Sequence, residues 1–202
     1  MRKKSHIALA HYLIRQDCTE NILKYKKAFY LGSILPDLSP KMFAVPHEYV
    51  SSYTELQAHI RGLTDGWYAH SNPHMFWRRL GVVLHYLADY FTYPHNTTYE
   101  GSLADHCIYE GDMKHSLREY VKTEEAEKVF RMQKYGKARF ESADELLSYI
   151  ENMHARYLQS KHTVESDCRW IVEMCSLVLL SITYLMEQNA RNGVIQLGAW
   201  VA

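Results

Sequence analysis

The sequence predicts an all-α protein, a single-domain multi-helix bundle over residues 1–202. No segment shows the alternation of apolar and polar residues that a half-buried strand requires. Glycine is sparse, and no repeat or low-complexity linker divides the chain. Prolines and capping residues instead separate segments that are rich in apolar side chains. A chain of this length fits one domain with a sizeable core.

The first part of the chain predicts two helices and a loop. The first helix is expected over residues 6–16, with Ser5 as its N-cap. A second helix is expected over residues 19–33, and Pro36 ends it. The next stretch, LSPKMFAVPHEYV, contains two prolines and predicts an irregular loop that carries His47.

The rest of the chain predicts only helices. The segment MFWRRLGVVLHYLADYFTY is dense in apolar residues, which indicates a helix buried over much of its circumference. The apolar run WIVEMCSLVLLSITYLM is interrupted by Glu173 and is shorter than a comfortable membrane span, so it predicts a core helix. The expected helices are 52–66, 73–92, 102–122, 124–134, 142–161 and 164–190.

Charge and cysteine usage narrow the class of protein. The 23 basic residues equal the 23 acidic ones, so no net field attracts polyanions, and no stable nucleic-acid complex is expected. Cys168 and Cys175 lie two turns apart on one predicted helix, about 10 Å, which is too far for a disulfide. Free thiols and the absence of a signal-peptide core predict a cytoplasmic protein without a transmembrane segment.

A cluster of potential metal ligands lies between residues 85 and 110. His85 and Asp89 are four residues apart, His95 follows Pro94, and His106 and Glu110 are again four apart. Residues four apart share one face of a helix, so each pair presents an imidazole and a carboxylate to one point. A single pair of this kind is expected about once by chance in a chain this rich in histidine. Two pairs flanking a further histidine predict a polynuclear metal site.

The string HYLADYFTYPHN, followed by HCIYE, resembles the zinc-dependent phospholipase C family, whose superfamily also holds single-strand nucleases. The resemblance covers about the first 115 residues, and it implies a helical bundle of the phospholipase C and nuclease type. Upstream, the family uses an early histidine, an aspartate in a Gly-x-x-x-Pro-Asp context and a histidine roughly ten residues later. The metal ligands that the resemblance implies are therefore His6, Asp37, His47, His85, Asp89, His95, His106 and Glu110.

The same resemblance implies two or three Zn²⁺ ions and a division of the ligands among them. Asp37 and His47 would join the first pair at one ion, and His95 would join the second pair at another. His6 and Asp89 would share the third ion, with Asp89 as a bridge and Asp37 also acting as the catalytic general base. Secreted members begin at a tryptophan whose amine and carbonyl bind this ion. This chain begins MRKKSH, so backbone or water is expected there instead.

The sequence leaves the activity open among three alternatives. The first is a phospholipase C-like hydrolase acting on a phospholipid or a small phosphodiester, and the second is a nuclease or nucleotidase. The third is a metal-binding protein without turnover. Taken alone, His6 would be a solvated terminal residue and His47 a surface loop residue. An aromatic set is expected mostly in the core, although its members could line a pocket: Tyr86, Tyr90, Tyr93, Tyr109, Trp67 and Phe43.

Overall fold

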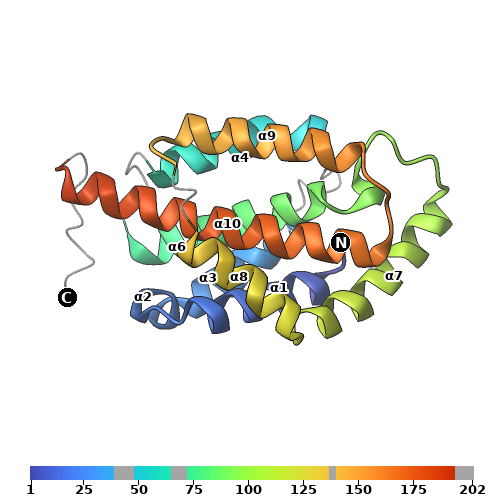
Figure 1. Cartoon of the computed structure of the whole chain (residues 1–202), viewed down its shortest axis with the longest axis horizontal. Helices are drawn as coiled ribbons and strands as arrows, with labels where there is room; N and C mark the ends of the chain where they lie inside the picture. The colour runs from blue at the N-terminus through green and yellow to red at the C-terminus, as the bar shows by residue number, and fades with distance from the viewer. Residues whose placement is uncertain (39–47, 65–71, 137–139, 194–202) are drawn as a thin grey trace.

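The computed structural model describes residues 1–38, 48–64, 72–136 and 140–193. Every regular element within these ranges is a helix, which confirms the predicted all-α class (Figure 1). The single-domain assignment over the whole chain stays a prediction. The elements are α1 (Lys3–Asp17), α2 (Glu20–Lys24), α3 (Lys26–Ile34), the 3₁₀ turn η1 (Pro36–Leu38), α4 (Tyr49–Thr64), α6 (Pro73–Tyr90), the 3₁₀ turn η3 (Tyr93–His95), α7 (Leu103–Tyr120), α8 (Glu124–Tyr135), α9 (Ala143–Leu158) and α10 (Val164–Arg191).

Side-chain caps define where most of the later helices begin. Asn72 accepts a hydrogen bond from the backbone N–H of His74, and Pro73 occupies the first position of α6. Ser102 and Asp105 form a reciprocal capping box at the start of α7. The hydroxyls of the residues before α8, α9 and α10 each accept a backbone N–H in the first turn. Each such cap stabilises its helix by about 1 kcal/mol.

Two predicted boundaries in the first part of the chain are wrong. Ser5 does not cap α1: it is buried inside the first turn, and its N–H donates to the carbonyl of Arg2. The helix therefore begins at Lys3, because the backbone of Arg2 starts the hydrogen-bonded turn. The helix expected over 19–33 is broken at Tyr25, whose ψ of 15° leaves helical geometry. The buried ring of Tyr25 packs edge-on against His74, a tertiary contact that the local sequence does not encode.

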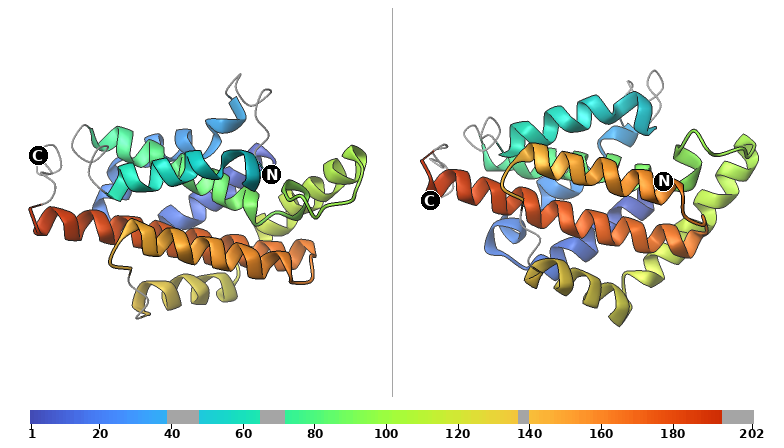
Figure 2. Two further views of the ribbon diagram at one scale, coloured as in Figure 1. Left: turned by 90° about the horizontal axis from the view of Figure 1, so that it is seen from above. Right: turned by 45° about the horizontal axis from the view of Figure 1, so that its top comes forward.

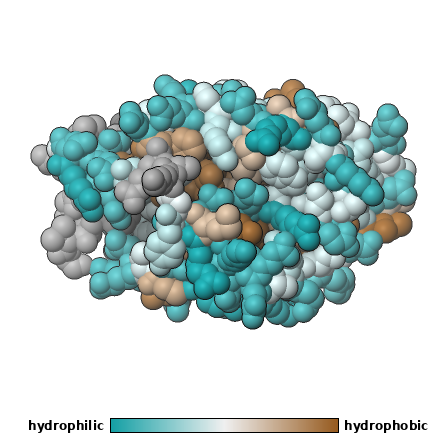
Figure 3. Space-filling view, in the orientation of Figure 1, coloured by the Kyte–Doolittle hydropathy of each residue, from teal (hydrophilic) through white to brown (hydrophobic). Residues whose placement is uncertain are grey.

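Helices α6 and α10 form the centre of the bundle. Helix α6 packs against α3, α4 and α10, and α10 also contacts α7, α8 and α9. Figures 1 and 2 show α4 and α9 on one side of this pair and α1, α3 and α8 on the other, while α7 leaves one end of the bundle. The outer face in Figure 3 is mainly hydrophilic, as expected where each outer helix turns one side to water.

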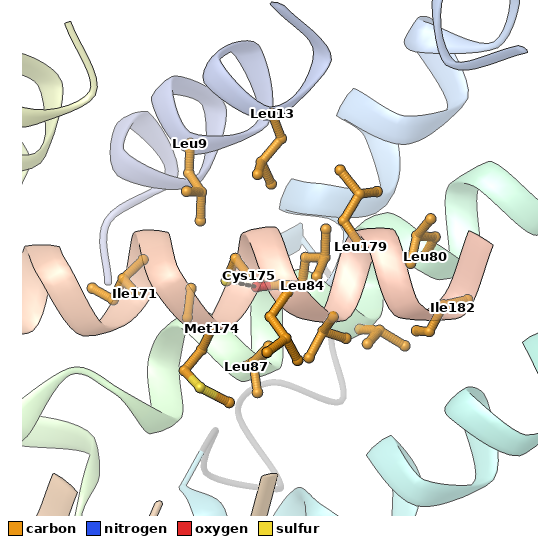
Figure 4. Close-up of a cluster of buried hydrophobic side chains, with 14 of the residues drawn as sticks. Leu9, Leu13, Leu80, Leu84, Leu87, Ile171, Met174, Cys175, Leu179 and Ile182 are labelled. Atoms are coloured by element: carbon orange, nitrogen blue, oxygen red, sulfur yellow. Dashed lines mark hydrogen bonds between the residues drawn. The ribbon is translucent and has the colours of Figure 1, made fainter. Parts of the chain in front are cut away.

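The part of the hydrophobic core that Figure 4 shows joins α1 and α10 to α6. Side chains of α1 and α10 interdigitate there with those of α6, and the Sγ of Cys175 lies 3.8 Å from the carbonyl oxygen of Leu84. Because such packing tolerates little displacement, it fixes the rotation of α6 about its axis. The buried residues labelled in the figure are Leu9, Leu13, Leu80, Leu84, Leu87, Ile171, Met174, Cys175, Leu179 and Ile182.

Helix α10 is long and apolar enough, by composition, to cross a membrane, and no other helix in the part of the chain that the structure describes is. However, 67% of its most apolar window is buried inside the protein, as in a core helix. This burial agrees with the predicted role of residues 164–190. The cytoplasmic location stays a prediction.

Helices α3 and α6 approach so closely that glycine is required on both. A Cβ at Gly32 would collide with the carbonyl oxygen of Arg78, and one at Gly81 would collide with that of Phe29. Both obstacles are backbone atoms, which cannot rotate aside as a side chain can. The contact places the end of α3 and the following turn η1 beside the second half of α6, where two predicted ligands lie.

Candidate metal centre

The first group of candidate ligands is buried between α1 and α6. His6 of α1 meets His85 and Asp89 of α6, and one ligand atom from each lies within 4.8 Å of the others. The two imidazole rings stack with centroids 3.8 Å apart. The Nε2 atoms of His6 and His85 lie 3.4 and 3.3 Å from the two carboxylate oxygens of Asp89. Each of these residues is 1% exposed, so water does not compensate their polarity.

The second group lies at the end of the bundle where α7 departs. His95 of η3 meets His106 and Glu110 of α7, and these ligand atoms also fall within 4.8 Å of one another. The Nε2 atoms of both histidines lie 3.3 Å from Oε1 of Glu110. All three residues are partly exposed. This group therefore opens to solvent, unlike the first.

The α-amino group of Met1 lies between the two groups. Its nitrogen is 2.6 Å from Oδ1 of Asp89, 2.7 Å from Nε2 of His95 and 3.2 Å from Oε1 of Glu110. Asp89 also lies 4.0 Å from Nε2 of His95, so its carboxylate is shared by both groups. The expectation for this position was backbone or water, and the atom found there is the backbone nitrogen of Met1. Its role as a metal ligand stays a prediction.

The charges of this cluster favour a cation. Burial raises the pKa of Asp89, but the Met1 ammonium and three histidines lower it more, and the net pKa is well below the usual range. Burial likewise opposes the ionisation of Glu110, yet hydrogen bonds from His106 and His95 and the Met1 charge lower its pKa. Burial lowers the pKa of the Met1 amine, and Asp89 and Glu110 raise it to a net increase. Two ionised carboxylates thus hold the chain's own ammonium.

The histidines of the buried group fit a metal ion. Burial lowers the pKa of His6 to about 3, so its ring is neutral; its Nε2 faces Asp89, and its Nδ1 has no hydrogen-bond partner among the described ranges. An imidazole buried in this way is costly unless something else binds it. The Nδ1–H of His85 donates to the carbonyl of Ser33 at 2.9 Å, which in the neutral ring turns the Nε2 lone pair toward Asp89. Neutral imidazoles, carboxylates and no thiolate match zinc in an open, catalytic site.

The two remaining predicted ligands come from the segment after α3. Asp37 of η1 reaches the buried group, and its Oδ1 lies 3.8 Å from Nε2 of His85. His47 lies outside the described residues, so its role stays a prediction. The structure thus brings Asp37, His85 and Asp89 together, as the resemblance implied for one ion, and it adds His6 to the same place.

A buried aspartate on α10 supports the second group. The Oδ2 of Asp167 accepts hydrogen bonds from the backbone N–H of Tyr93 and the hydroxyl of Tyr109, both at 2.8 Å. Its Oδ1 accepts from the hydroxyl of Tyr157 at 2.9 Å. Tyr93 belongs to the turn that carries His95, and Tyr109 precedes Glu110. Sequence reasoning missed Asp167, because nothing local marks a lone aspartate in the first turn of a helix as more than a helix-end charge.

A cleft of about 690 Å³ opens over the second group. Of the aromatic residues that could have lined it, Tyr86 and Tyr90 are buried in the core, as the core-packing interpretation predicts, and Trp67 and Phe43 lie outside the described residues. The cleft is lined by Met1, Arg2, Lys3, Lys4, Asp37, His95, His106, Glu110 and Lys114.

Comparison with known proteins identifies one family. A family model described as zinc dependent phospholipase C matches residues 5–164. The matched span begins one residue before His6 and ends at the first residue of α10, so it contains every predicted metal ligand. Searches of curated proteins and of solved structures found no match to this chain.

Proposed function

We propose that this chain, which belongs to the zinc-dependent phospholipase C family, is a phosphodiester hydrolase that works at the two ligand groups described above. The observation that carries the proposal is the position of Asp89, whose carboxylate contacts the buried group and approaches the exposed one. A shared carboxylate between two sets of nitrogen and oxygen ligands is the arrangement of a polynuclear site. The adjoining cleft gives a substrate access to it.

The proposed ligand sets follow this geometry. His6, Asp37, His85 and Asp89 would hold ions at the buried end, together with His47. His95, His106 and Glu110 would hold one ion at the exposed end, to give two or three Zn²⁺ in total. When bound, zinc supplies Lewis acidity, which polarises phosphate oxygens and acidifies water. Phosphodiesters and phospholipids are the proposed substrates.

Asp37 is proposed as the general base. It lines the cleft and also lies beside His85, so it stands between the metal ligands and the space for a substrate. A carboxylate in that position can orient a water molecule toward phosphorus and accept its proton. The carbonyl of Ser33 and the close contact between α3 and α6 hold the imidazole of His85, next to the proposed base, in place.

The first experiment measures zinc content by elemental analysis of protein purified without chelator. The same preparation is then assayed with a chromogenic phosphocholine ester and a chromogenic nucleotide diester. Asp37→Asn is expected to keep most of the zinc and to lose turnover by about 100-fold or more, the usual contribution of a general base. Asp112→Asn, at an exposed carboxylate of α7, is the matched control and should change neither quantity. Unchanged hydrolysis by Asp37→Asn would remove this residue from the mechanism.

A further inference from the structure

We infer that the preferred substrate carries a second anionic group beside the scissile phosphodiester, and that a basic rim on the cleft binds it. The basic rim consists of Arg2, Lys3, Lys4 and Lys114, which line the same cleft as His95, His106 and Glu110. The inference rests on the proposed function, because it specifies the substrate class of that site.

The charged residues of the cleft fall into two sets. The acidic ones among the described lining are Asp37 and Glu110, and both are proposed metal ligands. The basic rim is left without an acidic partner in the cleft, apart from Arg2, whose Nε lies 4.0 Å from Oε2 of Glu110. No ion pair within the described ranges involves the three lysines. Zinc at the ligand groups would add further positive charge. The lining of the cleft would then have a positive potential that attracts an anion.

The position of two of these lysines is unfavourable for the helix itself. Lys3 and Lys4 form the first turn of α1, which contains no acidic residue. The positive end of the helix dipole lies there, and cations at that end destabilise a helix by about 0.3–1 kcal/mol. The Met1 ammonium adds to the repulsion. Helix stability therefore does not explain these side chains, whereas a bound anion would be stabilised by the lysines and by the helix end together.

The other two basic residues of the rim, Lys114 and Arg2, are positioned by different local contacts. Lys114 follows Glu110 by one helical turn, the spacing of a favourable ion pair on a helix. The described structure holds no such pair, because Glu110 faces His95 and His106 instead. Arg2 is fixed by a hydrogen bond from Nη2 to the carbonyl of Cys107 at 2.7 Å. A guanidinium anchored in this way is suited to phosphate recognition.

The same lining disfavours a cationic head group. A quaternary ammonium is recognised by aromatic faces or by carboxylates. The described part of the lining offers no phenylalanine, tyrosine or tryptophan ring, and its histidines and carboxylates are committed to the ligand groups. A phosphate monoester next to the diester has the complementary charge. It could belong to a phosphorylated lipid head group or to a soluble nucleotide-like diester.

The test uses two chromogenic substrates that differ by one phosphate. These are thymidine 5′-(p-nitrophenyl phosphate) and the same compound with a 3′-phosphate, assayed with the zinc-loaded full chain. The 3′-phosphorylated substrate is expected to have about tenfold higher kcat/KM, because several partly screened charges each contribute modestly. Lys3→Gln, Lys4→Gln and Lys114→Gln combined should bring the ratio toward one. Lys128→Gln and Lys161→Gln, at exposed lysines outside the cleft, should keep the wild-type ratio.

A second assay, with lipid vesicles, distinguishes a phosphorylated lipid head group from a soluble diester as the source of the anion. Phosphatidylcholine vesicles carrying either phosphatidylinositol or phosphatidylinositol 4-phosphate are incubated with the same protein, and release of the phosphorylated head group is measured. Preference for the 4-phosphate lipid, lost in the triple lysine variant, assigns the rim to lipid head groups. Preference confined to the nucleotide pair assigns it to soluble diesters.

A binding measurement separates this inference from the proposed activity. Titration calorimetry compares thymidine 3′,5′-bisphosphate with thymidine 5′-monophosphate on the zinc-loaded protein, so it requires no turnover. Tighter binding of the bisphosphate by about tenfold, abolished in the triple variant, supports the inference even if none of the diesters is hydrolysed. Hydrolysis with equal kcat/KM values and equal affinities would overturn the inference and leave the hydrolase standing.

Discussion

The two ligand groups are built in opposite ways. The buried group rests on core helices: His6, His85 and Asp89 come from α1 and α6, whose rotation is set by the packing of the bundle. The exposed group rests on η3 and α7 at the end of the bundle, where the surrounding side chains are partly solvated. There Asp167 and its hydrogen bonds replace core packing as the positioning device.

This difference indicates that the two ends of the site have different roles. Ligands held by the core require no rearrangement to receive an ion, so the buried end is the preorganised half. The exposed end faces the cleft, through which the proposed substrate would reach the site. Asp89 joins the halves. Substitutions in each half test whether the two halves bind metal and fold independently.

The largest effect is expected from Asp89→Ala. This change removes the carboxylate that contacts the buried histidines and approaches His95, so more than one zinc ion per chain should be lost. We expect metal affinity to fall by at least about 100-fold, the upper range seen when an outer-sphere partner of a ligand is removed. Elemental analysis after gel filtration measures the loss. A variant that remains fully loaded would contradict the shared role of Asp89.

Glycine substitutions in the two halves should change the free energy of unfolding in opposite directions. Gly81→Ala forces a Cβ against the carbonyl of Phe29 and should destabilise the protein by about 3 kcal/mol or more. The new Cβ of Gly111→Ala on α7 meets only the guanidinium of Arg2, at the ordinary van der Waals distance of 3.7 Å, and the change should stabilise the protein by about 0.5–1 kcal/mol through helix propensity. Urea unfolding of both variants gives the free energies. Equal effects would show that α7 is packed as tightly as α6.

Asp167 should make stability depend on pH. Burial, the largest cause, raises its pKa from 3.8 to about 6, although hydrogen bonds from Tyr93, Tyr109 and Tyr157 oppose the shift. A raised pKa in the folded state means that the stabilising contribution is complete below pH 4 and is lost as pH rises through 6. Relative to Asp167→Asn, the metal-free wild type should therefore lose about 2–3 kcal/mol between pH 4 and pH 7.

Denaturant unfolding of both proteins at several pH values measures this difference. Glu165→Gln, at an exposed carboxylate in the same helical turn, is the matched control and should show the wild-type pH dependence. A difference between Asp167→Asn and the wild type that stays constant with pH would show that the aspartate is ionised throughout.

The smallest expected effect concerns the rate of metal release. A chromogenic chelator should remove zinc in two phases that differ by about tenfold, because partly exposed sites open locally more readily than core sites. His106→Gln should abolish the fast phase and His6→Gln the slow one. A single phase that both variants change alike would mean that the two groups release zinc as one unit.

The sequence by itself determined the local features of this protein. The helical class, most helix positions and the His-x-x-x-carboxylate pairs follow from spacing along one chain segment, where residues four apart must share a face. The candidate pairs His85/Asp89 and His106/Glu110 were predictable for this reason, whereas His95 between them was suggested by the family resemblance. The boundary errors at Ser5 and Tyr25 arose where a backbone hydrogen bond or a distant ring contact overrode the local pattern.

Only the tertiary structure decided which separate segments meet. The stacking of His6 on His85, the approach of Asp37 and the position of the Met1 amine depend on how α1, α3 and α6 pack, and the glycine contact between α3 and α6 sets that packing. Asp167 lies 58 residues from Tyr109 in sequence, yet it bonds to its hydroxyl. Such contacts depend on the mutual orientation of whole helices, which is set by the sum of many small packing terms and by no single spacing.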